Sequence, residues 1–322
     1  MNRDCGQSDS QGITDFLSWF RLFMSRDTII SRSEWAFIGA TGIADLVLSH
    51  FTGVPITVSW HVLAALAIIV AAWPVTLFVT QKTGFAKGSE VLAENAAKFF
   101  IFIFFVSAFE YFIASSSAPL YDERLIAIDA ALGFHWPDFF SWINDHRLIR
   151  KILAYCYVSL QIQAVLVLFL VGAIYPRRAH YFVTAFLISS CLTMLFFGLF
   201  PVAGPFVTYH HTDLPQAYYT EHYLQLRAHA MTVISLDDIR GIVSFPSFHV
   251  ASAVIITYFF RRMSFLTVLI ALLNIGMGIA ALVIGGHYLS DILAGIIVGI
   301  VTIAAIERLQ GQGQERPLSW KK

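Results

Sequence analysis

Two stretches of the sequence place ionisable side chains at the starts of strongly apolar runs. In GGHYLSDILAG, residues 285–295, His287 and Asp291 are four residues apart at the predicted start of a helix, so they share one face. A carboxylate in this position accepts a proton from one imidazole nitrogen, which fixes the tautomer. The second nitrogen is then free to act as a nucleophile or a base.

The other stretch is SFPSFHVASAVIITYFF, residues 244–260. Pro246 suits a helix start because its fixed φ and missing N–H cost nothing there. Ser247 can cap the helix, and the free backbone N–H groups that follow it form an anion site supported by the helix dipole. His249 falls within this first turn. These residue types together indicate a phosphate-binding site beside a second histidine.

Other interpretations of the same residues remain open at this point. A single histidine in a membrane helix can simply hydrogen-bond a neighbouring helix. Two histidines and an aspartate could also bind zinc, but the sequence contains no HExxH motif or other close pair of ligands, so we expect no metal. Two polar helix starts of this composition are difficult to ascribe to packing, and we therefore favour phosphoryl chemistry.

The composition indicates that these residues are positioned by membrane helices. Of 322 residues, 57% are hydrophobic and only 13% are charged, whereas soluble domains carry about 25% charged residues. The mean hydropathy is +0.68. The formal net charge is zero and no basic domain suggests a nucleic-acid partner. Three cysteines indicate neither a disulfide framework nor a cysteine-based zinc site.

Runs of about 20 apolar residues predict membrane-spanning helices, so we expect an all-α polytopic helix bundle. A single membrane domain, 34–310, is expected between an N-terminal cytoplasmic or interfacial segment, 1–33, and a cytoplasmic tail, 311–322. Two polar segments, 118–149 and 202–246, are expected to form interfacial helices that cap the outer face. About eight transmembrane helices are predicted, at 34–53, 57–80, 96–117, 150–175, 180–201, 247–262, 264–285 and 288–309.

The distribution of Lys and Arg predicts the orientation of this bundle. With both tails on one side, fourteen Lys and Arg fall on that side and six on the other. Positive residues favour the cytoplasm, so both termini are expected to be cytoplasmic. His249 and His287 would then lie in the outer half of the membrane, facing the exterior, the periplasm or a lumen.

The two motifs resemble the type-2 phosphatidic acid phosphatase superfamily, whose pattern is KxxxxxxRP, then PSGH, then SRxxxxxHxxxD. PSFH and GHYLSD match the second and third blocks in order and spacing, over about residues 240–300. More loosely, PLYDERLIAIDAALGFHWPDFF, 119–140, and LFPVAGPF, 199–206, look like segments of the branch that contains inositol phosphorylceramide synthases. Those enzymes often have a bulky residue where PSGH has glycine, as Phe248 is here. The resemblance implies a six-helix phosphatase-like core.

The sequence departs from the family pattern in its cationic residues. No lysine is followed seven residues later by arginine-proline, and the serine-arginine pair of the third block would fall at Ala280 and Ala281. A phosphoryl group that develops charge in a dry pocket needs fixed positive partners. Arg240 is the best candidate for this role, and Arg124 and Arg147 are weaker ones.

By resemblance, His287 attacks phosphorus to form a phosphohistidine and Asp291 orients it. His249 would protonate the leaving oxygen and then activate the incoming water or alcohol. Phosphate oxygens would be held by Ser247, by the adjacent backbone N–H groups at Phe248, and by Arg240. No metal and no organic cofactor are expected.

We therefore expect a membrane phosphoesterase that acts on a phospholipid or sphingolipid, with an alcohol or a second lipid as a possible acceptor. The missing first block and Phe248 favour transfer of a phosphate-containing headgroup, as in inositol phosphorylceramide synthases, over simple lipid phosphate hydrolysis. A proton-coupled transporter is an alternative of another class, and inverted repeats would support it. A metal-dependent membrane hydrolase is a further alternative function.

Overall fold

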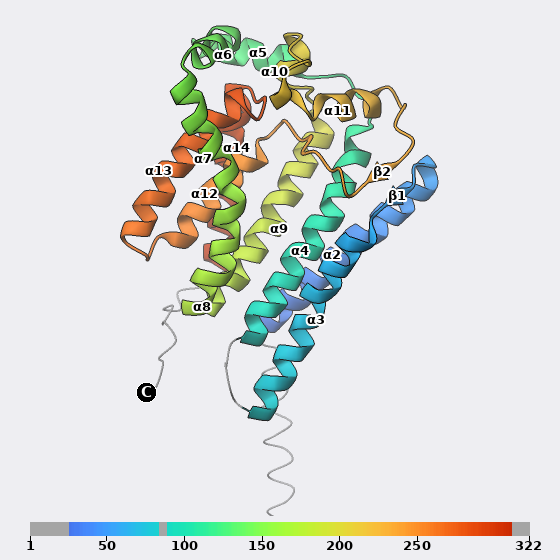
Figure 1. Ribbon diagram of the computed structural model, residues 1–322, viewed down its shortest axis with the longest axis vertical. Coiled ribbons are helices and arrows are strands. Elements are labelled where there is room, and N and C mark those ends of the chain that lie inside the picture. The colour runs from blue at the N-terminus through green and yellow to red at the C-terminus, as the bar shows by residue number, and fades with distance from the viewer. Residues whose placement is uncertain (1–25, 84–88, 311–322) are drawn as a thin grey trace, which may run out of the picture.

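The computed structural model describes residues 26–83 and 89–310, and these residues are almost entirely helical (Figure 1). The expected tail, 311–322, and most of the expected N-terminal segment, 1–33, lie outside the described residues. The described part begins with α2, which starts at Arg26 and so extends the first predicted span toward the N-terminus.

Each of the eight predicted spans contains a helix. The fourth span is one continuous helix, in which α7 is followed by a short π-helical segment, η1, and then by α8. The helices are α2 (Arg26–Thr52), α3 (Trp60–Thr83), α4 (Ser89–Ala114), α7 (Arg147–Leu166) with η1 (Val167–Val171) and α8 (Gly172–Ile174), α9 (Pro176–Leu199), α12 (Phe248–Phe260), α13 (Phe265–Val283) and α14 (Leu289–Gln310).

Within the described residues, six of these helices are long and apolar enough to cross a membrane, which is two fewer than predicted. The first exception is α2, which carries Glu34 and Asp45 as buried residues inside its length. The second is α12, whose 13 residues extend about 20 Å and do not reach across a hydrocarbon core of about 30 Å. The fold is nevertheless the expected all-α polytopic bundle.

The short helix α12 is enclosed by four other helices. It packs against α7, α9, α13 and α14, and eight of its residues are buried. Helix α4 packs against α9, while α2 and α3 lie outside α4. Because α12 is enclosed by other helices, its N-terminal turn is surrounded by protein and lies near one end of the bundle.

Short helices lie across that end of the bundle and form a cap (Figure 1). They come from the two predicted polar segments, which confirms that these segments are helical rather than extended. The segment before α7 forms two cap helices, and the segment before α12 forms three short ones. The cap elements are α5 (Asp122–Ala131), α6 (Trp136–Asp145), α10 (Pro205–Thr208), η2 (Pro215–Ala217) and α11 (Thr220–Arg227).

Two very short parallel strands, which the sequence did not suggest, tie the cap to the α2–α3 connection. Strand β1 (Ile56–Thr57) pairs with β2 (Ile234–Ser235), with Ile56 opposite Ile234. Beside this pair, Ser59 donates hydrogen bonds from its N–H and its hydroxyl to the carboxylate of Asp237, at 2.7 and 2.5 Å. The cap loop is therefore anchored to the outermost helices.

A buried ionic cluster holds α2 against α4 and α9. The Nζ atom of Lys98 is fully buried and lies 2.8 Å from carboxylate oxygens of both Glu34 and Glu94. Thr184 of α9 donates a hydrogen bond to Glu34, and Ser31 donates one to Glu94. This pairing explains how a helix with acidic residues is accommodated in an apolar bundle.

Replacing Lys98 with alanine is expected to destabilise the protein strongly. The variant would leave the buried carboxylate of Glu34 without its cation, which costs about 3–5 kcal/mol in comparable buried pairs. Thermal unfolding of the purified protein in detergent micelles measures the effect. Lys82→Ala is the matched control because Lys82 is exposed, and equal melting temperatures for the two variants would contradict the prediction.

Candidate active site

His287 and Asp291 lie together at the start of α14, where both are almost completely buried. Nδ1 of His287 is 3.4 Å from Oδ2 of Asp291. The same oxygen accepts hydrogen bonds from the hydroxyl of Ser244, at 3.2 Å, and from the N–H of Tyr288, at 2.8 Å. The carboxylate is therefore fixed on the Nδ1 side of the imidazole, and Nε2 is the nitrogen that faces the other residues of the site.

Ser247 and His249 approach His287 from the start of α12. Ser247 occupies the N-cap position, as expected, but its hydroxyl forms no capping hydrogen bond and instead lies 3.3 Å from Nε2 of His287. The centroids of the His249 and His287 rings are 6.5 Å apart. Pro246 precedes the N-cap instead of opening the helix itself. The structure thus brings together Ser247, His249, His287 and Asp291.

The ring of His249 is held by a tyrosine that the sequence analysis did not identify. Tyr157 of α7 stacks on His249, with ring centroids 4.9 Å apart and an interplanar angle of 19°. All three residues, Tyr157, His249 and His287, line the same cavity. Nothing in the sequence of the α7 span distinguishes Tyr157 from an ordinary lipid-facing aromatic residue.

Gly286 makes the turn that delivers His287 into the site. It has a φ of +65°, a conformation that is costly for residues with a side chain. A Cβ atom there would lie 2.3 Å from the hydroxyl oxygen of Tyr219 and 2.7 Å from the ring of Phe206. Gly285 does not have a positive φ, but a Cβ atom there would lie 2.9 Å from the carbonyl oxygen of Ala281, so both glycines of GGH are closely packed.

Close packing of α12 against α14 sets the distance between the two histidines. The N–H of Ser247 donates a 3.1 Å hydrogen bond to the carbonyl oxygen of Asp291, so the two helix starts are joined directly. A Cβ atom on Gly295 would lie 2.4 Å from the carbonyl oxygen of Ser247. One turn later, a Cβ atom on Gly299 would lie 2.8 Å from Val254. These small residues allow the backbones to approach.

We expect Gly295→Ala to lower activity by about 10²-fold, the usual cost of displacing reacting groups by about 1 Å. The new methyl group has to push α14 away from Ser247 and so separates His287 from His249. Gly278→Ala in α13 is the matched control, because a Cβ atom there meets nothing within 4 Å. Turnover of a lipid phosphate by the two variants measures the difference. Equal rates would show that the contact between Gly295 and Ser247 does not determine the positions of the two histidines.

Two aspartates of the cap fix the start of α14 from outside the helix. The carboxylate of Asp129 accepts 2.8 Å hydrogen bonds from the N–H groups of Leu289 and Ser290 and so caps α14 from a distant segment. Asp122 accepts hydrogen bonds from the hydroxyl of Tyr288, at 3.0 Å, and from the N–H of Gly204, at 2.9 Å. The sequence analysis had noted the 119–140 segment without assigning these residues.

Phe248, predicted at the phosphate-binding site, lines the cavity around the histidines and also packs against α9. Its ring packs edge-on against Phe186, with centroids 5.1 Å apart. Only the backbone N–H of Phe248 is suited to hold a phosphate oxygen, because the first N–H groups of a helix have no acceptor within the helix.

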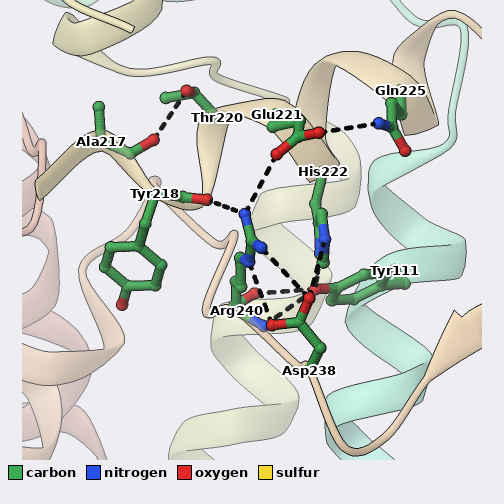
Figure 2. A network of polar contacts seen from close by, with 9 residues as sticks. All are labelled: Tyr111, Ala217, Tyr218, Thr220, Glu221, His222, Gln225, Asp238 and Arg240. Atoms are coloured by element: carbon green, nitrogen blue, oxygen red, sulfur yellow. Dashed lines mark hydrogen bonds and ion pairs between the residues drawn. The ribbon is translucent and has the colours of Figure 1, made fainter. Parts of the chain in front are cut away.

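Arg240, the predicted cationic ligand, is held in the cap and is not among the residues that line the cavity around the histidines. Figure 2 shows its guanidinium between the carboxylates of Asp238 and Glu221, at 3.2 and 3.5 Å, and its Nη1 also donates to the carbonyl oxygen of Tyr218. Hydrogen bonds to Asp238 raise the pKa of Arg240 above its ordinary value.

The same network attaches the cap to α4. The backbone N–H of Arg240 donates to the hydroxyl of Tyr111, which also lies 2.8 Å from Nδ1 of His222 (Figure 2). Burial and the nearby charge of Arg240 lower the pKa of His222 below its ordinary value. The two weaker candidates, Arg124 and Arg147, are exposed, and Arg124 lies over the ring of Tyr121.

A small cavity of about 100 Å³ lies where these elements meet, and we call it the histidine cavity. His249 and His287 line it from α12 and from the loop before α14. Glu110 of α4, which the sequence analysis did not identify, lines it as well. Its other lining residues are Tyr157, Met194, Tyr218, Tyr219, Gly241, Val243, Phe248, Ile284 and Gly285.

The fold and this site define an all-α integral-membrane protein with two histidines around one cavity near the capped end of the bundle. The chain belongs to the PAP2 superfamily, whose family model matches residues 123–305, from α5 into α14. Membership supports a lipid enzyme of the phosphatase or phosphotransferase type. No curated protein and no solved structure was found to match the chain.

Proposed function

We propose that this protein is a lipid phosphotransferase that works through a phosphohistidine at His287. The observation that carries the proposal is the arrangement of His287 between Asp291, 3.4 Å from Nδ1, and the cavity that also contains His249. A carboxylate on one side of an imidazole and a free nitrogen on the other make the imidazole a nucleophile.

In the first step, Nε2 of His287 attacks the phosphorus of a bound phospholipid. A P–N bond forms, the P–O bond to the lipid alcohol breaks, and His249 supplies the proton that the leaving oxygen takes up. The Asp291 carboxylate stabilises the positive charge on the imidazole as the bond forms. The headgroup stays attached to phosphorus in the resulting intermediate.

In the second step, His249 removes the proton from the hydroxyl of an acceptor. The acceptor oxygen attacks phosphorus, the P–N bond breaks, and its electron pair returns to His287. Both histidines are then in their starting protonation states. Water in place of the acceptor gives hydrolysis by the same route.

Phosphate oxygens are proposed to bind at the start of α12, to the hydroxyl of Ser247, which lies 3.3 Å from Nε2 of His287, and to the first backbone N–H groups of the helix. These groups and the helix dipole supply the positive potential that the absent family cations would otherwise give. No metal is part of this mechanism, so activity is expected to survive treatment with a chelator. Loss of activity with EDTA and recovery with a divalent cation would favour a metal-dependent hydrolase.

Two apolar grooves support a lipid substrate. One, of about 530 Å³, lies between α2, α4 and α9 and shares Met194 with the histidine cavity. The other, of about 270 Å³, lies between α4, α7 and α12 and shares Phe248 and His249 with it. Acyl chains in these two grooves would bring two lipids to the same cavity.

This pair of grooves, together with the resemblance to inositol phosphorylceramide synthases, favours transfer between lipids over hydrolysis. The test supplies the purified protein with phospholipid labelled at phosphorus, with and without ceramide, diacylglycerol or inositol. We expect the label in a new lipid when a lipid acceptor is present. Release of the label as free phosphate or headgroup phosphate alone, whichever acceptor is present, would show that the protein hydrolyses the phospholipid and does not transfer its headgroup. Lipid flux that persists without phosphoryl chemistry after His287→Ala would instead favour a transporter.

We also propose that the capped end faces the exterior, the periplasm or a lumen and that both termini are cytoplasmic. The connection between α12 and α13, which carries Arg261 and Arg262, lies at the end of the bundle opposite the cap (Figure 1). Positive residues at that end are typical of the cytoplasmic side. Transfer would then occur on lipids of the outer leaflet.

A further inference from the structure

Glu110 is an acidic residue in the histidine cavity that the proposed mechanism does not use. It lies on α4, outside the segment that matches the family, yet it lines the same cavity as His249 and His287. The backbone N–H of Ile242, in the loop that leads to α12, donates a hydrogen bond to its carboxylate. Glu110 is therefore held in place beside the reacting groups.

The charges around the cavity do not suit a strongly anionic substrate. Of the described residues that line it, none is a lysine or an arginine, and Glu110 is acidic. Arg240, the nearest candidate cation in the sequence, is paired with Asp238 and Glu221 in the cap. A phosphate monoester with two negative charges would meet this carboxylate with only the start of α12 and the proton of His249 to offset its charge, which is unfavourable in a poorly solvated site.

Three tyrosines complete the wall of the cavity. Tyr157, Tyr218 and Tyr219 line it beside Glu110. Figure 2 shows the ring of Tyr218 pointing away from Arg240, which binds only its carbonyl oxygen, so Arg240 helps to position this tyrosine. Tyrosine rings and phenol oxygens attract ammonium groups, and a carboxylate among aromatic side chains is a typical environment for them.

We propose that Glu110 binds the ammonium group of a zwitterionic phospholipid, so that the headgroup transferred by His287 is an amino alcohol phosphate. This inference rests on the proposed function and extends it to the class of substrate. The phosphate lies at the start of α12, and the ammonium group reaches toward Glu110 and the tyrosines. The ammonium group of the substrate thereby takes the place beside Glu110 that no described lysine or arginine of the cavity lining fills.

The test compares donors with the same acyl chains and different headgroups. Wild-type protein, Glu110→Gln and the control Glu123→Gln are assayed in vesicles with phosphatidylethanolamine, phosphatidylcholine, phosphatidylglycerol and phosphatidylinositol. Glu123 is an exposed residue of α5 outside the cavity. We expect the wild type to prefer the two ammonium donors. Glu110→Gln should lower kcat/KM for these two by about 10–100-fold and leave phosphatidylglycerol nearly unchanged.

The comparison of the two ammonium donors identifies the contact. A primary ammonium donates hydrogen bonds to Glu110, whereas a quaternary one does not, so a larger loss with phosphatidylethanolamine indicates direct hydrogen bonding. A wild-type preference for phosphatidylinositol or phosphatidylglycerol would overturn the proposal. An equal loss on all four donors would overturn it too, because Glu110 would then act in the chemistry or the fold.

Binding separates this inference from the proposed function. Short-chain versions of the four donors can be titrated into the His287→Ala variant, which is expected to perform no chemistry, with intrinsic tryptophan fluorescence as the readout. Tighter binding of the ammonium lipids supports the role of Glu110 even if no phosphoryl transfer is found in the wild type. Binding without headgroup preference would contradict the role even if transfer is found.

Discussion

Replacing His287 with alanine is expected to lower turnover by about 10⁴-fold or more, the effect of removing a nucleophile that forms the covalent intermediate. In the proposed mechanism this imidazole bonds to phosphorus, and of the described residues that line the cavity the only other histidine is His249. Initial rates with a labelled phospholipid and a lipid acceptor measure the loss.

The control for this variant is His135→Ala. His135 lies in the cap just before α6 and is largely exposed, paired with Asp138 at 2.8 Å. Its replacement is expected to leave the rate close to that of the wild type. The melting temperature of His287→Ala shows whether the variant folds. If it folds and retains a substantial part of the activity, His287 is not the nucleophile.

Replacing His249 with alanine is expected to lower turnover by about 10²–10⁴-fold, the usual contribution of a general acid–base group. The loss should depend on the leaving group, because His249 supplies its proton. A donor with an acidic leaving alcohol, such as a nitrophenyl phosphodiester, leaves without protonation and should recover much of the rate of the first step. The same donor should give no recovery in His287→Ala.

Burst kinetics separate the two roles of His249. With the nitrophenyl donor, the variant should release one equivalent of nitrophenol quickly and then stall, because the acceptor is no longer activated. Tyr155→Ala is a suitable control, since Tyr155 lies on α7 near Tyr157 but is exposed. Equal losses with lipid and nitrophenyl donors would contradict an acid–base role.

The helical spans could be predicted because the thickness of a bilayer fixes the length of an apolar run. All eight predicted spans contain a helix, from α2 to α14. Hydropathy could not distinguish α12 from a spanning helix, because a short helix enclosed by other helices is as apolar as one that faces lipid. For this reason α12 was counted as a span, while α2 is long enough but carries the buried acidic residues Glu34 and Asp45.

The residues of the two motifs could be selected from sequence because each lies at a helix start with a clear chemical use. Their neighbours could not, because contacts such as Tyr157 on His249 and Asp129 on the start of α14 join segments far apart in the chain. Arg240, in contrast, was selected from the sequence for a role that its place in the fold does not favour. Its position before the PSFH motif suggested a phosphate ligand, but its charge is paired with Asp238 and Glu221 in the folded protein.

The most direct test of the phosphohistidine at His287 is to trap it. Wild-type protein is mixed with phosphorus-labelled phospholipid without acceptor, quenched in alkali at low temperature, digested, and mapped by mass spectrometry. The mechanism predicts a base-stable, acid-labile adduct on His287 that is absent from His287→Ala and retains the headgroup on phosphorus. Turnover with no adduct under these conditions, or an adduct on any other residue, would contradict the mechanism.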